Sequence, residues 1–416
     1  MLPEGFIDRL SSVVGEGPAR LFAAAVAQAP SVSLRLNPFK TPAFPDPLLE
    51  GAGAVPWSSY GRMLAARPNF TLQPLFHAGA YYVQDSSAMF AGWVVRQLLD
   101  SLDPSPERPV RVLDLCAAPG GKTTDLAASL RERYGDRFLL VANEVMRNRA
   151  AVLSDNVAVW GDPNVVVTSA DPGAFASLPG FFDLVLADVP CSGEGMFRKD
   201  AKAVEDWSEQ TVSLCAARQK RILSDAWPAL RRDGVLVYST CTFSPAENDG
   251  NVAWMAGALD AETATPESAF DGVLKTSCGC LLVPGLVPGE GQYVAAVRKC
   301  SGPAASRKGD AELQRLRPLR SGVRKGEMKG RDFVPDPDWA LSLSLERGEW
   351  PEYEVDGTTA LRFLHRDALV LPEAPAGYVL LTYAGLPLGF VKNLGPRCNN
   401  LHPQRRRIVM DINSKK

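Results

Sequence analysis

Two cysteines stand directly behind apolar runs in the middle of the chain. Cys191 ends the segment "FDLVLADVPC", with Asp188 and Pro190 just before it, and Cys241 ends the segment "GVLVYSTC". Apolar runs of this length that alternate with helical patterns are typical of parallel strands buried on both faces. Because the carboxyl ends of parallel strands meet at one edge of a sheet, we predict that both thiols and the Asp188 carboxyl group face one crevice.

Methylation of a pyrimidine carbon is a reaction that needs such a set of groups. Carbon 5 of cytosine is too electron-poor to attack a sulfonium methyl group. A thiolate that adds to carbon 6, with a proton delivered to ring nitrogen 3, turns carbon 5 into a nucleophile. After methyl transfer the carbon-5 proton must leave so that the thiol can be expelled. Cys241, Asp188 and Cys191 are suitable groups for these three roles.

Simpler explanations of the cysteines stay open at this stage. Lone cysteines are more often buried apolar fillers, and a disulfide would need an oxidising compartment. Zinc would need more ligands nearby, and the three histidines, His77, His365 and His402, lie outside this region. The pair Cys278 and Cys280 also suggests a metal, but no further ligands can be placed beside it, so we predict no metal site.

A glycine-rich turn, "VLDLCAAPGGKTT" at residues 112–124, follows another apolar run and opens a helical pattern. Such a turn brings a ligand close to the backbone at a helix N-terminus. The ending "GGKT" resembles a phosphate-binding P-loop, but Cys116 stands where that motif needs its first glycine. A plain strand-to-helix turn is the remaining alternative. We predict a cofactor site here.

Two acids follow the next two apolar runs. Glu144 comes 23 residues after Gly121, a spacing that suits a carboxylate bound to the two hydroxyl groups of a ribose. A solvated glutamate at the start of a helix is the alternative. Asp171 follows the third run and is placed to accept from an adenine amino group, although Asp-Pro is also a common turn signal.

The elements that would hold these residues form an α/β pattern. The expected strands are residues 110–115, 138–144, 164–170, 182–188, 234–240 and 292–298, with helical stretches between them. We predict three regions: an α+β segment at 1–100, a Rossmann-like domain at 101–300, and a β-rich domain after a basic linker at 301–416. A helix of about four turns is expected after "YYVQD", with Asp85 or Ser86 as its cap.

Composition narrows the class of protein. The 416 residues are 46% hydrophobic and 22% charged, with a net charge of −2, so overall charge does not indicate a nucleic-acid binder. The N-terminus lacks the pattern of a signal peptide, and the chain holds no apolar run long enough to span a membrane. Eight cysteines without a secretory signal favour reduced thiols. We therefore expect a cytoplasmic protein that does not enter a membrane.

Three motifs, "DLCAAPGGKT", "DVPCSGEGMFRKD" and "YSTCTFSPAEN", together resemble the RNA cytosine-C5 methyltransferases of the Sun/Fmu kind. The lead "YYVQDSSA" is similar to a segment of that family. Residues 316–341 and 387–407 resemble the C-terminal region of its RsmF subgroup, which modifies small-subunit ribosomal RNA, although "PRCNNLHPQRRR" matches loosely. The resemblance implies S-adenosyl-L-methionine as cofactor, a PUA-like C-terminal domain, and 16S rRNA or the small subunit as partner of a monomeric enzyme.

The resemblance also implies roles for single residues. Cys241 would be the nucleophile and Cys191 would assist release, whereas DNA cytosine methyltransferases use the Pro-Cys thiol as nucleophile. Asp188 would lie between cofactor and base, with Lys122 close by. The implied cofactor contacts are Cys116, Ala117, Ala118, Pro119, Gly120, Gly121, Lys122, Glu144, Asp171 and Asp188.

A basic run, Arg307 to Arg331, carries nine Lys or Arg against three Asp or Glu, a net charge of +6. Such runs are usually solvated linkers, but phosphate binding is the expectation here because the run leads into the β-rich domain. The reacting cytosine would have to be unstacked to enter the crevice. Three alternatives stay open: a cytosine-C5 methyltransferase of tRNA or another RNA, a DNA cytosine methyltransferase, and a non-catalytic RNA-binding assembly factor.

Overall fold

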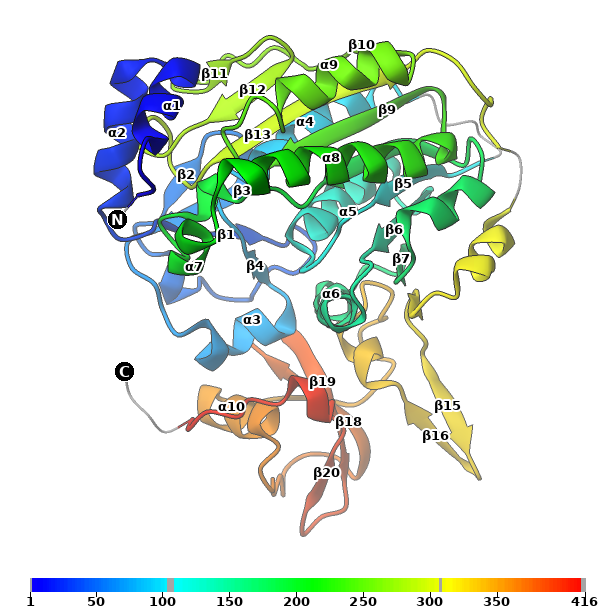
Figure 1. The fold of residues 1–416 in the computed structure, drawn as a ribbon. Coiled ribbons are helices and arrows are strands. Elements are labelled where there is room, and N and C mark those ends of the chain that lie inside the picture. The colour runs from blue at the N-terminus through cyan, green and yellow to red at the C-terminus, as the bar shows by residue number, and fades with distance from the viewer. Residues whose placement is uncertain (1, 103–107, 307–308, 413–416) are drawn as a thin grey trace.

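A large mixed sheet forms the centre of the protein in the computed structural model, which describes residues 2–102, 108–306 and 309–412 (Figure 1). The strands lie in the order β11-β12-β13-β9-β8-β5-β6-β7-β14, and β10 pairs with β13. Five strands run parallel: β5 (Val110–Asp114), β6 (Phe138–Asn143), β7 (Val165–Thr168), β8 (Phe182–Asp188) and β9 (Leu230–Thr240). The others run antiparallel to their partners: β10 (Ala261–Thr263), β11 (Leu274–Lys275), β12 (Gly279–Leu282), β13 (Gln292–Lys299) and β14 (Arg320–Ser321).

All six strands expected from the sequence are present, but the expectation of a wholly parallel sheet is wrong for the sixth. Strand β13 enters the sheet through a hairpin with β12, without a helical crossover, and therefore runs antiparallel to β9. Tyr293, near the start of β13, pairs with Thr240 at the end of β9. The reversed direction thus places residues 290–292 beside the carboxyl end of β9, next to Cys241.

Helices cover both faces of this sheet (Figure 1). Successive strand residues alternate between two cores, with Leu113 and Val141 in one and Val112 and Leu140 in the other. The first core is covered by α1 (Phe6–Val14), α2 (Glu16–Val26), α8 (Glu209–Ala226) and α9 (Asp249–Ala258). The second is covered by α4 (Met89–Leu99), α5 (Gly121–Tyr134) and α6 (Arg147–Trp160). No helix of the described residues is long and apolar enough to cross a membrane.

Helix α4 begins later than expected and has no side-chain cap. Its first residue is Met89, and it spans 11 residues. Asp85 is drawn into a tight turn, where its carboxylate accepts from the backbone and hydroxyl group of Ser87 and from the backbone N–H of Glu290. The prediction that Asp85 or Ser86 caps the helix was therefore wrong. The Asp85 carboxylate is already hydrogen-bonded within the turn and to Glu290, and it accepts no hydrogen bond from the first turn of α4.

Two smaller sheets share a third core. The N-terminal part holds β1 (Val32–Leu36), β2 (Gly53–Val55), β3 (Ser58–Leu64), β4 (Tyr81–Val83) and α3 (Pro74–Ala78), with the strand order β2-β3-β1-β4. The C-terminal part holds β17 (Glu352–Glu354), β18 (Gly377–Tyr383), β19 (Leu386–Asn393), β20 (Cys398–Asn400) and α10 (Gly357–His365). Leu34 and Leu75 from the first part pack in one cluster with Phe363 and Val379 from the second. A short helix, α7 (Ala201–Glu205), lies between β8 and α8 in the chain. Strands β15 (Gly326–Lys329) and β16 (Asp332–Pro335) pair in an antiparallel hairpin.

Candidate active site

A cavity of about 770 Å³ opens at the carboxyl ends of the parallel strands. Nearly every residue predicted to bind cofactor or substrate lines it: Cys116, Ala117, Ala118, Pro119, Gly121, Lys122, Glu144, Asp171, Asp188, Cys191 and Cys241. Gly120 lies just behind the lining, where its φ of 115° is a left-handed conformation that favours glycine. The structure therefore brings the predicted residues from the ends of five strands, β5 to β9, into one space.

The glycine turn is held by groups from two other parts of the chain. The Pro119 carbonyl oxygen accepts from the Tyr82 hydroxyl group at 3.1 Å and from the Asn156 amide at 2.7 Å. Arg35, on β1, is buried behind the turn and donates to the Gly121 carbonyl oxygen at 3.2 Å. A buried guanidinium with fixed acceptors is rigid, so the N-terminal sheet positions the predicted cofactor loop.

The two acids predicted to bind the nucleoside differ in their surroundings. Glu144 is buried, accepts from the backbone N–H of Met146 at 2.9 Å, and lies 3.1 Å from an Arg149 guanidinium nitrogen. Asp171 is exposed at the rim, where it accepts from the backbone N–H of Gly173. A carboxylate accepts about four hydrogen bonds, so Glu144 keeps capacity for ribose hydroxyl groups beside its present partners.

Asp114, the last residue of β5, is a cavity residue that the sequence interpretation missed. One carboxylate oxygen accepts from the Thr123 hydroxyl group at 2.7 Å, and the other is buried without a hydrogen-bond partner among the described residues. Burial, together with the nearby charges of Asp188 and Glu144, raises the pKa of Asp114 to about 7. An acid inside an otherwise apolar strand was the available signal, since buried carboxyl groups are rare without a function.

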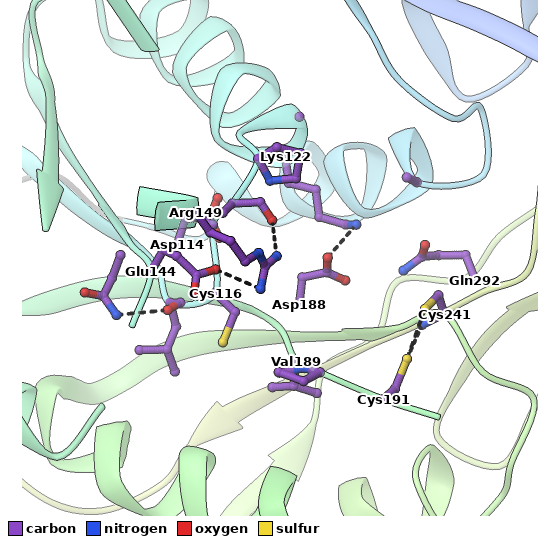
Figure 2. A pocket seen from close by; sticks show the side chains of 18 of the residues that line it. Asp114, Cys116, Lys122, Glu144, Arg149, Asp188, Val189, Cys191, Cys241 and Gln292 are labelled. Atoms are coloured by element: carbon purple, nitrogen blue, oxygen red, sulfur yellow. Dashed lines mark hydrogen bonds and ion pairs between the residues drawn. The ribbon is translucent and has the colours of Figure 1, made fainter. Parts of the chain in front are cut away.

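The two thiols meet at the other end of the cavity (Figure 2). The sulfur atoms of Cys191 and Cys241 lie 3.0 Å apart, and the backbone N–H of Cys241 donates to the Cys191 sulfur at 3.2 Å. Both are free cysteines. The Cys241 sulfur and burial raise the pKa of Cys191 well above its ordinary value, so Cys191 is neutral beside Cys241.

An ion pair lies between the glycine turn and the thiols. The Lys122 ammonium group donates to Asp188 at 2.9 Å. Burial opposes its charge, but Asp188 and the Cys241 thiolate outweigh burial and raise the pKa of Lys122. Lys122 is therefore a fixed positive charge close to Cys241, and such a neighbour stabilises a thiolate.

A buried hydrogen-bond network holds the loops of the two cysteines together from behind. The Glu247 carboxylate accepts from the backbone N–H and the hydroxyl group of Ser192, and from the Gln219 amide at 2.8 Å. Gln219 donates as well to the Pro190 carbonyl oxygen at 2.9 Å. Thus the residues "SPAEN" after Cys241 and a glutamine on α8 position the loop that carries Cys191.

A second buried carboxylate ties the same loops to the N-terminal helix. Glu194, fully buried, pairs with Arg9 of α1 and accepts from the Trp207 indole at 2.9 Å. It also accepts from the backbone N–H of Phe243, two residues after Cys241, at 2.8 Å. Sequence reasoning missed these supporting residues because their partners lie far away along the chain.

Two further side chains that were not predicted, Gln292 and Lys199, line the cavity. Gln292, at the start of β13, is buried beside Cys241 and donates to the Ser239 hydroxyl group (Figure 2). Lys199 pairs with Asp85 and lies 3.5 Å from a Glu290 carboxylate oxygen. Neither was predicted, because the reversed direction of β13 and the tertiary turn at Asp85 place them.

The basic run is less available to phosphate than its sequence suggests. Residues 307 and 308 lie outside the described residues. Residues 320–321 join the central sheet as β14, and the rest leads into the β15–β16 hairpin (Figure 1). Five of its described cations contact acids: Arg315 with Glu312, Arg320 with Asp338, Arg324 with Asp336, Lys325 with Glu349, and Lys329 with Glu327. Phosphate binding by this run stays a prediction.

Cys278 and Cys280 pack into different core clusters on the two sides of the sheet. In the described part of the chain no group of three or more His, Cys, Asp or Glu side chains is arranged to hold a metal ion. The free-thiol explanation suits this pair, because the two side chains do not converge.

Replacement of Glu144 by alanine is expected to weaken binding of S-adenosylmethionine. A charge-assisted hydrogen bond to a ribose hydroxyl group contributes about 1.5–3 kcal/mol, so the loss of one such bond alone should raise the dissociation constant roughly 10- to 150-fold. Isothermal titration calorimetry measures this directly. Arg149→Ala is the matched control, since it removes the ion pair but keeps the carboxylate. Unchanged affinity in Glu144→Ala would exclude Glu144 from the cofactor site.

Three parts of the chain match models of known protein families. Residues 100–298 match the family of 16S rRNA methyltransferase RsmB/F, residues 2–86 match the N-terminal domain of 16S rRNA methyltransferase RsmF, and residues 351–408 match the methyltransferase RsmF PUA domain. The PUA match confirms the expected type of C-terminal domain.

Curated relatives and solved structures point the same way. The chain is 31% identical to ribosomal RNA small subunit methyltransferase F of Serratia proteamaculans, covering 80% of this chain and 79% of the relative. It is 30% identical to the Enterobacter protein of that name, covering 86% and 84%. A methyltransferase homolog protein from Pyrococcus horikoshii is similar in structure, with a TM-score of 0.57, 26% identity, and coverage of 70% and 93%. The chain therefore belongs to the RsmB/F family of 16S rRNA methyltransferases.

Proposed function

We propose that this enzyme transfers a methyl group from S-adenosyl-L-methionine to carbon 5 of a cytosine in RNA, with 16S ribosomal RNA as the substrate. The observation that carries the proposal is the pair of free thiols, 3.0 Å apart, in the same cavity as the glycine turn and the Lys122–Asp188 ion pair. The family membership and the names of the relatives support the substrate.

Cys241 is the nucleophile in this proposal. The Asp188 carboxylate takes the thiol proton of Cys241 and passes it to ring nitrogen 3, while the Cys241 thiolate, which Lys122 favours, attacks carbon 6. Carbon 5 then takes the methyl group that S-adenosylmethionine supplies in electrophilic form. At this stage the Cys241 sulfur is bonded to carbon, and carbon 5 carries both the methyl group and its original proton.

Cys191 acts in the release step. The pKa of Cys191 is raised by the Cys241 sulfur while both thiols are free. Once Cys241 is bonded to carbon 6 it carries no negative charge, so this obstacle to ionising Cys191 disappears. Cys191 loses its own proton to water, and its thiolate takes the carbon-5 proton. The double bond between carbons 5 and 6 then re-forms, the Cys241 sulfur leaves as thiolate, and ring nitrogen 3 returns its proton through Asp188 to Cys241.

The cavity residues suit the proposed cofactor. Cys116 and Lys122 border the expected methionine part, Glu144 the ribose and Asp171 the adenine edge. The unpartnered oxygen of Asp114 and the carboxylate of Glu144 are acceptors for the hydrogen-bond donors of the cofactor. Burial raises the pKa of Cys116, with neighbouring carboxylates adding to the effect, so this thiol stays neutral and does not compete as a nucleophile.

Cofactor affinity is expected to depend on pH through Asp114. Its pKa of about 7 means that the free enzyme holds this carboxyl group neutral below pH 7 and charged above it. A cationic sulfonium ligand favours the charged form, so binding should tighten by up to about tenfold per pH unit as the pH rises toward 7, and then level off. Calorimetry from pH 5.5 to 8.5 measures this. The Asp114→Asn variant should lack the rise, and an equal rise in both proteins would exclude Asp114 as its source.

Methyl transfer from labelled S-adenosylmethionine to free 16S rRNA, to assembled small subunits, to tRNA and to DNA tests the proposed function. Label in 5-methylcytosine of rRNA supports it. Label in DNA alone would identify a DNA cytosine methyltransferase, and RNA binding without any transfer would identify an assembly factor. Free rRNA and assembled subunits used as separate substrates show which of them is recognised.

We further propose a monomer that works in the cytoplasm, where its ribosomal substrate is assembled. The proposed division of the chain is residues 1–100, 101–300 and 301–416. The family matches at 2–86, 100–298 and 351–408 support it. The contribution of β14 to the central sheet indicates that the third region begins in close association with the second.

A further inference from the structure

Five cations line the cavity, and they differ in whether a carboxylate neutralises them. Lys122, Arg149 and Lys199 each contact an acid, as described above. Arg218 and Arg221, both on α8, are exposed and line the same cavity. Within the described residues their side chains form neither an ion pair nor a hydrogen bond. These two guanidinium groups are therefore available to a ligand from outside.

The exposed face of α8 extends this pair. Leu214, Arg218 and Arg221 stand at positions i, i+4 and i+7, which lie on one side of a helix. The Leu214 side chain is 61% exposed, unusual for a large apolar residue. Met196, 36% exposed, lines the cavity beside the thiol end. Apolar surface beside two free arginines suits a nucleic-acid strand. The apolar side chains can contact bases or sugars, and the arginines can contact the phosphates between them.

Electrostatics make such cations necessary. The six carboxylates of the cavity lining are Asp85, Asp114, Glu144, Asp171, Asp188 and Glu290. They outnumber the five cations, and the whole chain carries a net charge of −2. A polyanion that approaches this cavity is repelled unless unpaired positive charge stands at the rim. Arg218 and Arg221 supply such charge, and arginine is especially suited to phosphate.

We propose that Arg218 and Arg221 clamp the RNA phosphates that flank the reactive nucleotide, with Leu214 in contact with an adjoining base or ribose. The proposal rests on the proposed function for its substrate and adds the surface by which the strand is held at the cavity. The clamp contacts the backbone, so it provides affinity and placement of the strand without selecting a sequence.

The double variant Arg218→Gln/Arg221→Gln tests the clamp against the control Arg137→Gln/Arg232→Gln. The control residues are exposed just before β6 and near the start of β9, at the opposite edge of the sheet from the cavity. Fluorescence anisotropy measures RNA affinity from 50 to 300 mM KCl. Loss of two phosphate contacts should lower the slope of log affinity against log salt by about 1.4–1.8 and weaken binding about 25- to 60-fold at 0.1 M salt. Leu214→Ser should weaken binding without changing the slope.

Cofactor affinity is expected to be unchanged in the double variant, because in this proposal the two arginines contact RNA and not the cofactor. Affinity and slope equal to those of the control would overturn the clamp. Weaker cofactor binding with normal RNA binding would overturn it too, because the arginines would then belong to the cofactor site. Failure of the proposed function is a separate result: the wild-type protein would transfer no methyl group to RNA, while the comparison of salt slopes would still decide whether these arginines bind phosphate.

Discussion

Replacement of Cys191 by alanine is expected to leave the enzyme covalently bound to its RNA after methyl transfer. The variant keeps the Cys241 thiol, the Lys122 ammonium group and the Asp188 carboxyl group, so addition and methyl transfer proceed. It lacks the group that takes the carbon-5 proton, and the bond between sulfur and carbon 6 stays closed. Multiple-turnover methylation should fall by about 10²- to 10⁴-fold, the usual contribution of a positioned acid or base.

Denaturing electrophoresis with labelled RNA detects this adduct as a shifted protein band. Cys241→Ala should abolish methylation and form no adduct, and the double variant should form none either, because the trapped bond belongs to Cys241. Cys215→Ala is the matched control: this buried cysteine on α8 does not line the cavity, and its loss should leave turnover intact. An adduct that appears in Cys241→Ala and maps to Cys191 would reverse the two roles and place the enzyme with the DNA-type chemistry.

Asp188→Asn is expected to slow formation of that adduct by about 10²- to 10⁴-fold. Asparagine keeps the shape of the side chain, but it cannot deliver a proton to ring nitrogen 3, and carbon 6 is a poor electrophile until that nitrogen is protonated. The substitution also removes the partner that stands 2.9 Å from the Lys122 ammonium group. Both effects act on the addition step, before the methyl group moves.

Single-turnover formation of the adduct in a Cys191→Ala background isolates this step from release. Asp171→Asn is the matched control, because Asp171 lies at the same sheet edge but is exposed. Its proposed role is at the adenine edge of the cofactor, and it takes no part in the addition step. The control should form the adduct at the parent rate when cofactor is saturating. Adduct formation at the parent rate in Asp188→Asn as well would assign the proton to another group, with Lys122 as the next candidate.

The strands and the thiols were predictable because local pattern alone encodes them. Apolar runs at regular intervals predicted β5 through β9, and parallel strands necessarily end at one edge. Each predicted residue followed directly on such a run, so Cys116, Glu144, Asp188, Cys191 and Cys241 could be placed in one crevice without coordinates. The fold class and the family also followed from short motifs, and the comparisons confirm both.

The direction of β13 was not predictable from its residues. An apolar strand has the same composition whether it runs parallel or antiparallel, and only its connection to β12 decides between the two. That decision places Gln292 and Glu290 at the cavity. The helix cap expected at Asp85 was wrong for a similar reason. Its carboxylate accepts from the backbone N–H of Glu290, which lies 205 positions further along the chain.

For charged residues, too, the sequence determined some features and the tertiary structure decided others. The sequence determined where cations are dense, and it pointed to the run ending at Arg331. Only the tertiary structure decided which cations are free, because an ion pair depends on an acid that folding brings within a few ångströms. It neutralised Lys122 with Asp188 and paired much of the basic run, and it left Arg218 and Arg221 at the cavity rim without an ion-pair partner among the described residues. The chain thus determined by itself the chemistry of each strand end, while long-range packing decided which groups meet and which remain available to a partner.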